Sequence, residues 1–333
     1  MSTYKELHGF RVESVSSNPS NPKEGEVWYN STLGQLKGYV LAPATWASGG
    51  ALSTGRSLLG GDGTQTAAFA VAGLDNSTYK NNTENYNGSS WTNSGTYPQS
   101  IYSVGSAGTQ TAGLAFGGAL PGSPDSNVTA EYDGSSWTAV PGNFPVSSGG
   151  QTGFGTQTAA LSNLPSSNTT VAYNGTAWTA YPSSGNQNTS RLDGVAQNGT
   201  QTAGLMFTGR TGPGPVNTQA TEEWDGSTWT ASNNYPAGMV FAQGAGTQTA
   251  AVGFGGDKPP GEAAQTTTCT YDGSSWTAAN ALASAITRHG SAKNGTQIAA
   301  LQFGGIGPSG GGEGLTTTQE FTGAVETRTL TTS

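Results

Sequence analysis

Residues 108–118 read Gly-Thr-Gln-Thr-Ala-Gly-Leu-Ala-Phe-Gly-Gly, and the first five of these recur almost unchanged along the chain. The pentapeptide, with Ile replacing the second Thr in its last copy, begins six times, at Gly63, Gly108, Gly155, Gly199, Gly246 and Gly295. Successive copies start 45, 47, 44, 47 and 49 residues apart. A period of this length predicts one structural unit repeated six times.

A second motif keeps the same period. It consists of an aromatic residue, Asp or Asn, Gly, two small residues and Trp, and it spans residues 86–91, 132–137, 173–178, 224–229 and 271–276. Asp-Gly and Asn-Gly favour hairpin turns because they tolerate positive φ. With a strand after each pentapeptide and another before it, the unit has four strands, which is typical of a β-propeller blade.

Other residues recur at matched positions within the period. Phenylalanines stand eight residues after the pentapeptide glycine in four units, and glycine pairs follow three of them, where a side chain would obstruct a sharp exit from the strand. We expect the tryptophans to pack between blades and not to form a sugar-binding platform. The residues that define the repeat are Trp46, Trp91, Trp137, Trp178, Trp229, Trp276, Gly117, Gly118, Gly255, Gly256, Gly304 and Gly305.

The two ends of the repeat array are complementary. Trp46 precedes the first pentapeptide by 17 residues, and the later tryptophans precede theirs by 17 to 21 residues. The last unit carries Phe-Thr-Gly-Ala-Val-Glu at residues 321–326, without the tryptophan. We therefore predict an all-β chain, a six-bladed propeller in which the strand around Trp46 completes the sixth blade and removes an open sheet edge.

Composition excludes several function classes. The 333 residues carry a net charge of −8, and the 12 lysines and arginines are not clustered, which argues against nucleic acid as a partner. No apolar run reaches the roughly 18 residues of a membrane span, and the first ten residues lack a secretory pattern, so we expect synthesis in a cytoplasm and no membrane insertion. The single cysteine, Cys269, excludes an internal disulfide and is expected to fill a strand.

The repeat resembles known families. A glycine pair closing an apolar strand, followed by an aromatic residue and a tryptophan, is similar to the kelch repeat of galactose-oxidase-like β-propellers, and the likeness covers about residues 46–330. The blades are therefore expected to be kelch-like. Arg56, Arg191 and Arg288 hold a kelch-like arginine position in some units only. The near-verbatim repeats also resemble those of structural proteins of tailed bacteriophages.

The N-terminal segment does not repeat. Residues 26–29 and 35–39 can pair across the turn at residues 30–34, forming a hairpin that is marginal unless it docks on something. Its pattern resembles a short module near the start of phage fibre, tail and other virion proteins, which implies anchoring; simple capping of the propeller is the alternative. We assign residues 1–45 to an N-terminal anchor segment and 46–333 to the propeller, with candidate virion-anchoring residues Trp28, Tyr29, Leu36 and Tyr39.

Few residues suit catalysis or metal binding. The only histidines, His8 and His289, make no credible metal set, and Cys269 does not supply the copper site that the galactose-oxidase likeness implies. Asp62, Asp75, Asp125 and Asp257 show no dedicated calcium pattern, so only an incidental ion stays open. We expect no cofactor.

Sialidases are also propellers, and that class is the alternative. Asp133, Asp225 and Asp272 occupy a turn position where Asn87 and Asn174 also occur, which indicates turn geometry and not acid–base chemistry. Glu222 and Glu223 are adjacent strand residues and face opposite ways. Arg56, Arg191 and Arg288 could point together toward the axis and hold a carboxylate, which keeps a sialidase-like function open. We expect no enzyme and no catalytic residue.

Variation between units is concentrated in the loops after the glycine pairs, which are rich in proline and glycine and poor in aromatic residues. We expect a bacteriophage virion protein, located in the virion after synthesis in the host cytoplasm. Its expected partners are other virion proteins, through the N-terminal segment, with host cell-surface glycan or protein as a further contact. Several copies per virion are expected. The alternative is a carbohydrate-binding or sialidase-like propeller.

Overall fold

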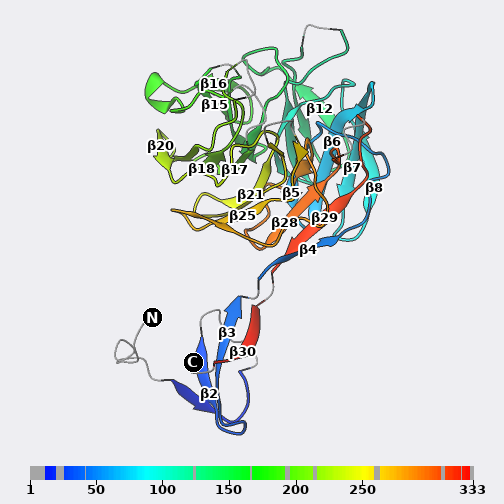
Figure 1. Cartoon of the computed structure of the whole chain (residues 1–333). Helices are drawn as coiled ribbons and strands as arrows, with labels where there is room; N and C mark the ends of the chain where they lie inside the picture. The colour runs from blue at the N-terminus through cyan, green and yellow to red at the C-terminus, as the bar shows by residue number, and fades with distance from the viewer. Residues whose placement is uncertain are drawn as a thin grey trace. The chain divides into compact units, whose positions relative to one another are not determined.

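The computed structural model describes residues 12–19, 26–41, 43–122, 125–165, 167–191, 196–212, 216–258, 263–308, 312–323 and 325–330 (Figure 1). Two compact units are present: Thr45–Thr322 form one, and Met1–Ala44 with Gly323–Ser333 form the other. The larger unit is built from antiparallel sheets of four strands.

The first three blades follow one another directly along the chain. Each is a meander, in which every strand pairs with the next. Their strands are β5 (Gly60–Thr64), β6 (Ala67–Asp75), β7 (Thr78–Tyr86) and β8 (Trp91–Thr96) in blade 1; β9 (Gly105–Thr109), β10 (Ala112–Phe116), β11 (Thr129–Tyr132) and β12 (Trp137–Val140) in blade 2; and β13 (Gly153–Thr156), β14 (Ala159–Asn163), β15 (Thr170–Tyr173) and β16 (Trp178–Ala180) in blade 3.

Blades 4 and 5 repeat the meander, and blade 5 carries a small ribbon, β23 (Asp257–Lys258) with β24 (Ala263–Ala264), between its second and third strands. Blade 6 takes its fourth strand from the other end of the chain. The strands are β17 (Ala196–Thr200), β18 (Ala203–Phe207), β19 (Thr221–Trp224) and β20 (Trp229–Ser232) in blade 4; β21 (Gln243–Thr247), β22 (Ala250–Phe254), β25 (Thr268–Tyr271) and β26 (Trp276–Ala278) in blade 5; and β27 (Gly290–Ser291), β28 (Ala299–Phe303), β29 (Thr318–Thr322) and β4 (Thr45–Ser48) in blade 6.

The first strands of the blades form a closed ring. β5 contacts β9, β9 contacts β13, and the series continues through β17, β21 and β27 back to β5. In the part of the chain that the structure describes, this ring confirms the prediction of a six-bladed propeller of four-stranded blades.

The ring closes where the two ends of the repeat array meet. β4 pairs antiparallel with β29 (Figure 1). In this register Trp46 stands opposite Phe321. The strand around Trp46 therefore completes blade 6, as its spacing predicted. Without β4, β29 would be an exposed edge strand with unpaired backbone groups, and the pairing of the two strands prevents this.

The pentapeptide is the turn between the first two strands of each blade. Its Gln and following residue form the two-residue loop, for example Gln110 and Thr111 between β9 and β10, and the preceding Gly108 has a φ of 102°. The glutamine side chain reaches the preceding blade: the Gln110 amide donates to the carbonyls of Ala68 (2.9 Å) and Tyr86 (2.6 Å). The corresponding amide contacts with the preceding blade recur at Gln65, Gln157, Gln201, Gln248 and Gln297.

Each repeat tryptophan also bonds to the preceding blade. The Trp137 indole N–H donates to the Thr83 hydroxyl of blade 1 at 2.8 Å, and the rings of Tyr132 and Phe69 lie against it. The same bond joins Trp46 to Thr268, Trp91 to Thr318, Trp178 to Thr129, Trp229 to Thr170 and Trp276 to Thr221. The motif tryptophans therefore lie between blades.

The core lies between neighbouring sheets. Phe116, Phe207, Phe254 and Phe303 end the second strands of their blades and are fully buried. The glycines that follow adopt left-handed conformations: Gly117, for example, has a φ of 65° and Gly118 a φ of 104°. A Cβ at Gly118 would lie 2.7 Å from the Ile101 side chain, so the chain can leave the strand there only without a side chain.

The smaller unit is a four-stranded sheet made from both ends of the chain. Its order is β1 (Glu13–Val15), β2 (Val27–Asn30), β3 (Gln35–Leu41) and β30 (Val325–Thr329). The expected hairpin of β2 and β3 is present. The expected propeller boundary at residue 333 differs from the structure: β30 pairs with β3, because the last blade already has β4 as its fourth strand.

Within the described ranges, no helix is long and apolar enough to span a membrane.

Candidate functional site

Two of the candidate arginines form buried ion pairs within their own blades. Arg191 lies 2.7 Å from Glu222 on β19, and Arg56 lies 2.8 Å from Glu84 on β7. All four side chains are at most 1% exposed. The two carboxylates hold equivalent repeat positions, two residues before the aromatic residue that ends the third strand.

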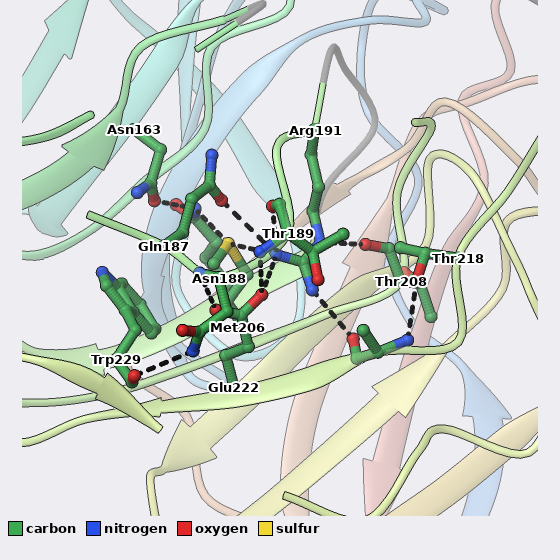
Figure 2. Close-up of polar contacts among 12 residues, drawn as sticks. Asn163, Gln187, Asn188, Thr189, Arg191, Met206, Thr208, Thr218, Glu222 and Trp229 are labelled. Atoms are coloured by element: carbon green, nitrogen blue, oxygen red, sulfur yellow. Dashed lines mark hydrogen bonds and ion pairs between the residues drawn. The ribbon is translucent and has the colours of Figure 1, made fainter. Parts of the chain in front are cut away.

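The Arg191 guanidinium is saturated by its surroundings. It donates to the carbonyls of Thr208, Thr189 and Ala220 at 2.8 to 3.1 Å, and Glu222 also accepts the backbone N–H groups of Asn188 and Thr189 (Figure 2). Burial lowers the pKa of Arg191, and the Glu222 charge partly offsets this effect. The pair ties the loop before β17 to the blade, and all three guanidinium nitrogens donate hydrogen bonds within the protein.

Arg56 forms the corresponding ion pair in blade 1, but its buried Nε has no hydrogen-bond partner. It donates to the Asn82 carbonyl at 3.0 Å, while Glu84 accepts the backbone N–H and the hydroxyl of Ser53. Burial lowers the pKa of Arg56 to about 10, against the raising effect of Glu84.

Arg288 occupies a different place, over the Phe241 ring with its Cζ 5.2 Å from the ring centroid. Arg56, Arg191 and Arg288 therefore do not converge on the axis. The three-arginine carboxylate site that the sialidase-like alternative left open is not formed, because Arg56 and Arg191 are paired with glutamates of their own blades.

A ring of left-handed residues surrounds the axis where the first strands begin. Leu58, Ser103, Phe241 and Arg288 stand two residues before β5, β9, β21 and β27, and their φ angles lie between 50° and 57°. Such angles are strained for residues other than glycine and are over-represented at functional sites.

Backbone hydrogen bonds join three of these residues across neighbouring blades. The N–H of Leu58 donates to the Arg288 carbonyl, that of Ser103 to the Leu58 carbonyl, and that of Gly150 to the Ser103 carbonyl, at 2.7, 2.7 and 3.1 Å. Each bond crosses from one blade to the next, so the left-handed residues help to join blades 6, 1, 2 and 3 at this level.

An axial cavity of about 60 Å³ lies inside this ring. Described residues of blades 1, 2, 3, 5 and 6 line it, with Arg288, Phe241 and Gln151 in its wall and Ser106 and Lys293 among the deeper residues. The volume corresponds to about four water molecules. We regard this cavity as the candidate axial site.

Lys293 and Asp62 form the buried charged pair of the axis. The ammonium lies 3.9 Å from the carboxylate, and both side chains are at most 7% exposed. Burial raises the pKa of Asp62 to about 7, against the lowering effects of Lys293 and of backbone N–H groups; burial likewise lowers the pKa of Lys293. Sequence reasoning missed this pair, although Lys293 stands alone among the residues two positions before the pentapeptide glycine in being charged.

The aspartates of the second motif cap their own turns. Asp133 accepts the backbone N–H groups of Ser135 and Ser136 at 2.8 and 2.7 Å, and Asn87 accepts the equivalent pair in blade 1. The hydrogen bonds lower the pKa of the exposed Asp133. The equivalent bonds from Ser274 and Ser275 lower the pKa of Asp272 to about 2. The contacts agree with a role in turn geometry.

The carboxylates considered for an incidental calcium ion are dispersed. Asp62 faces Lys293, Asp75 ends β6 beside Lys80 at 3.5 Å, and Asp257 begins the β23 ribbon. Across the described ranges, no three His, Cys, Asp or Glu residues gather in a way that could hold a metal ion. Cys269 is buried in β25, at the position that Glu222 holds in blade 4.

A shallow groove of about 710 Å³ crosses blades 4 and 5. Its lining is mainly hydroxyl and amide side chains, with Lys258 as the charged residue among those described. Val216, which is 60% exposed, also lines it. The groove includes residues from the variable loop of blade 4.

The four candidate anchoring residues lie on both faces of the small sheet. Trp28 is 1% exposed, and its indole N–H donates to Asn18. Tyr29 is 40% exposed and stands opposite Leu36, on the other face. Tyr39, by strand alternation, shares the face of Trp28.

Comparison with known proteins identifies the fold. No protein-family model matches the chain, and no curated protein matches it. A solved structure described as the structure of YjhT is similar to it, with a TM-score of 0.66 and 14% sequence identity over 83% of this chain and 99% of the other. At this identity the likeness concerns architecture alone, and together with the closed ring of six sheets in the described residues it establishes a β-propeller.

Proposed function

We propose that this protein is a structural protein of a bacteriophage virion, a propeller displayed on the surface of a tail fibre, tail or head. The small unit attaches it to other virion proteins, and the propeller mediates assembly contacts or host attachment. It acts by binding and without chemistry. The resemblance of the repeats and of the N-terminal module to phage structural proteins motivates the proposal.

The distribution of exposed apolar residues is the observation that carries it. Among described residues, six large hydrophobic side chains are exposed, and five of them belong to the small unit: Val12, Val27, Tyr29, Leu33 and Leu330. Val216 in the propeller is the sixth. Clustered exposed apolar residues mark interaction sites.

One face of the small sheet exposes apolar residues. Val27 and Tyr29 lie on the same face of β2, and Tyr29 stands opposite Leu36. The Leu330 side chain lies over Gly38, the partner of Val27, and so extends this face. The apolar face of a sheet is normally buried against a second layer of structure. A partner that covers Val27, Tyr29 and Leu330 would supply the missing burial, and the repeated units of a virion surface would present several copies.

The absence of chemistry is part of the proposal. The arginines that could have held a substrate carboxylate are paired with Glu84 and Glu222. The repeated aspartates accept hydrogen bonds from their own turns. The paired arginines and the turn aspartates therefore have structural roles that substrate binding would disturb.

Particle association tests the proposal. Full-length protein is incubated with phage particles produced by a host that lacks the native copy, and sedimented with them. We expect the native chain to sediment with particles and Val27→Asp/Tyr29→Asp to stay in the supernatant with an unchanged propeller melting temperature. Val216→Asp, which places a charge on an exposed apolar residue outside the small unit, is the matched control and should sediment. Equal sedimentation of all three, or of none, contradicts the proposal.

Carbohydrate binding is the second candidate, and the groove of blades 4 and 5 favours it. Its hydroxyl and amide lining suits a neutral glycan more than a charged one. A glycan array with the full chain tests it, with Asn217→Ala and Lys258→Ala as groove variants. Reproducible glycan cleavage would contradict the proposal that the protein performs no chemistry.

A further inference from the structure

We propose that the propeller axis contains a cation-binding cage of oxygen atoms, specific for a primary ammonium group, which the chain fills with its own Lys293. When the lysine side chain is removed, the cage will take a small alkylammonium ion from solvent. The proposal does not depend on the virion function.

The lysine reaches the axis through an insertion found in blade 6. Ala292 bonds to Leu301 and Thr296 pairs with Ala299, so three residues, 293–295, stand opposite Ala300 alone. In blade 5 the equivalent register has one residue, Gly246, opposite Ala251. The two extra residues let the chain leave the strand and turn inward.

The cage is made of oxygen atoms from blades across the axis. The Lys293 ammonium donates to the carbonyls of Ser106 and Gly153, each at 2.6 Å, and lies 3.2 Å from the Ser106 hydroxyl. Three oxygen partners match the three N–H bonds of an ammonium group.

The neighbouring Asn294 completes the crossing. Its side-chain amide donates to the Gly108 carbonyl at 2.6 Å, and its backbone N–H donates to Asp62 at 3.1 Å. The Lys293 carbonyl accepts the N–H of Gly246 at 3.1 Å. Residues 293 and 294 thus connect blade 6 to blades 1, 2, 3 and 5.

The charge balance also suits a cation. The Asp62 carboxylate lies 3.9 Å from the ammonium, and its Oδ2 has no hydrogen-bond partner. Inward-directed carbonyls, and Asp62 in its charged form, are costly to bury without a positive group among them. Removing the lysine side chain therefore leaves oxygen atoms that attract a replacement cation.

The axial cavity supplies the route to the cage. Lys293, Ser106 and Gly61 line the cavity, together with the half-buried Ser103 and Arg288 of the mouth. A small ion can enter along the axis without separating the blades.

Chemical rescue tests the proposal. Lys293→Ala is melted in ethylammonium chloride and in sodium chloride of equal concentration. We expect a lowered melting temperature that rises with ethylammonium in a saturable way and much less with sodium, as for a ligand that binds only the folded state. Wild type and Lys258→Ala, which removes an exposed lysine, should respond equally to the two salts.

Two further arms make every outcome decisive. Lys293→Met fills the cage with an uncharged chain, so it should be destabilised and insensitive to ethylammonium; wild-type stability in this variant overturns the proposal. Calcium chloride at matched ionic strength is the third salt, and rescue by calcium alone overturns the ammonium specificity. If Lys293→Ala does not fold unaided, refolding yields in the same salts replace melting, and equal yields overturn the proposal.

Discussion

At the residue scale, the repeat position that holds the buried glutamate in blades 1 and 4 holds a small or apolar residue in three other blades. The site of Glu84 and Glu222 is occupied by Ala130, Val171 and Cys269 in blades 2, 3 and 5. A repeat position that accepts either a charged or an apolar residue has a packing role. Buried ion pairs often contribute no more to stability than the hydrophobic residues that can replace them. This exchange accounts for a buried arginine in blades 1 and 4 and none at this place in blades 2, 3 and 5.

We predict that Arg191→Ala lowers the free energy of unfolding by about 3–5 kcal/mol, because Glu222 remains buried without a cation. Arg191→Met/Glu222→Val should recover most of the loss, since blade 3 already has valine at this position. Urea denaturation measures both. A double variant less stable than Arg191→Ala would show that the ion pair itself is required.

Asp62 gives the stability a distinctive pH dependence. Its pKa of about 7 in the folded chain exceeds the ordinary value of 3.8, so between these values the folded state binds more protons than the unfolded state. Its contribution therefore falls as pH rises from about 4 to 7. His289 acts in the opposite direction over part of this range, because burial lowers its pKa from 6.5 to about 4.

We predict that Asp62→Asn removes the declining contribution. The difference in unfolding free energy between wild type and Asp62→Asn should become less favourable to wild type as pH increases from 4.5 toward 7. Denaturation at a series of pH values measures it, with His289→Gln as the variant expected to change the slope in the other direction. A difference that does not vary with pH would contradict the raised pKa of Asp62.

At the element scale, β4 distinguishes blade 6 from the other blades. Each of the other described sheets of the propeller is a continuous stretch of chain, whereas β4 is separated from β29 by the whole array. The same tryptophan bond occurs at every blade, but at Trp46 it holds the seam. Removing the tryptophan from β4 should therefore affect the protein differently from removing the equivalent tryptophan of another blade.

We predict that Trp46→Ala and Trp137→Ala each cost about 3–5 kcal/mol, as large core truncations do. Only Trp46→Ala should also release the seam, because no turn connects β4 to another strand of its sheet. Amide hydrogen exchange is the measurement. When denaturant is adjusted so that both variants have the same free energy of unfolding, the amides of β29 should exchange faster in Trp46→Ala than in Trp137→Ala. Identical exchange in β29 would show that the seam does not depend on this side chain.

At the scale of the whole molecule, the chain forms two units, and strands from before and after the repeat array build the smaller one. β30 pairs with β3 along Lys37–Leu41, so the small sheet needs residues beyond the last blade. The propeller is already closed by β4. The two units should therefore respond separately to loss of the C-terminal strand.

We predict that ending the chain after Thr322 leaves the melting temperature of the propeller unchanged and speeds amide exchange in β3, which loses its edge partner. A chain ending after Leu330 retains β30 and is the control. A large fall in the propeller melting temperature would contradict the independence of the two units.

The sequence by itself determined the repeat, the number of blades, the hairpin turns and the seam. Each depends on local periodicity or on the chemistry of one motif: Asp-Gly turns are local, and the missing tryptophan at residues 321–326 matched the extra one at Trp46. The tryptophans could be placed between blades because a side chain that recurs with every blade has a structural cause. The return of β30 to β3 had no comparable signal.

Only the tertiary structure decided what gathers at the axis and which arginines are available. Asp62, Ser106, Gly153 and Lys293 come from four blades and meet because the ring closes, while two inserted residues direct Lys293 inward. The arginines looked equivalent in the sequence, yet Arg56 and Arg191 find glutamates and Arg288 lies over Phe241. Contacts between residues distant in sequence depend on closure and burial, which no single repeat encodes.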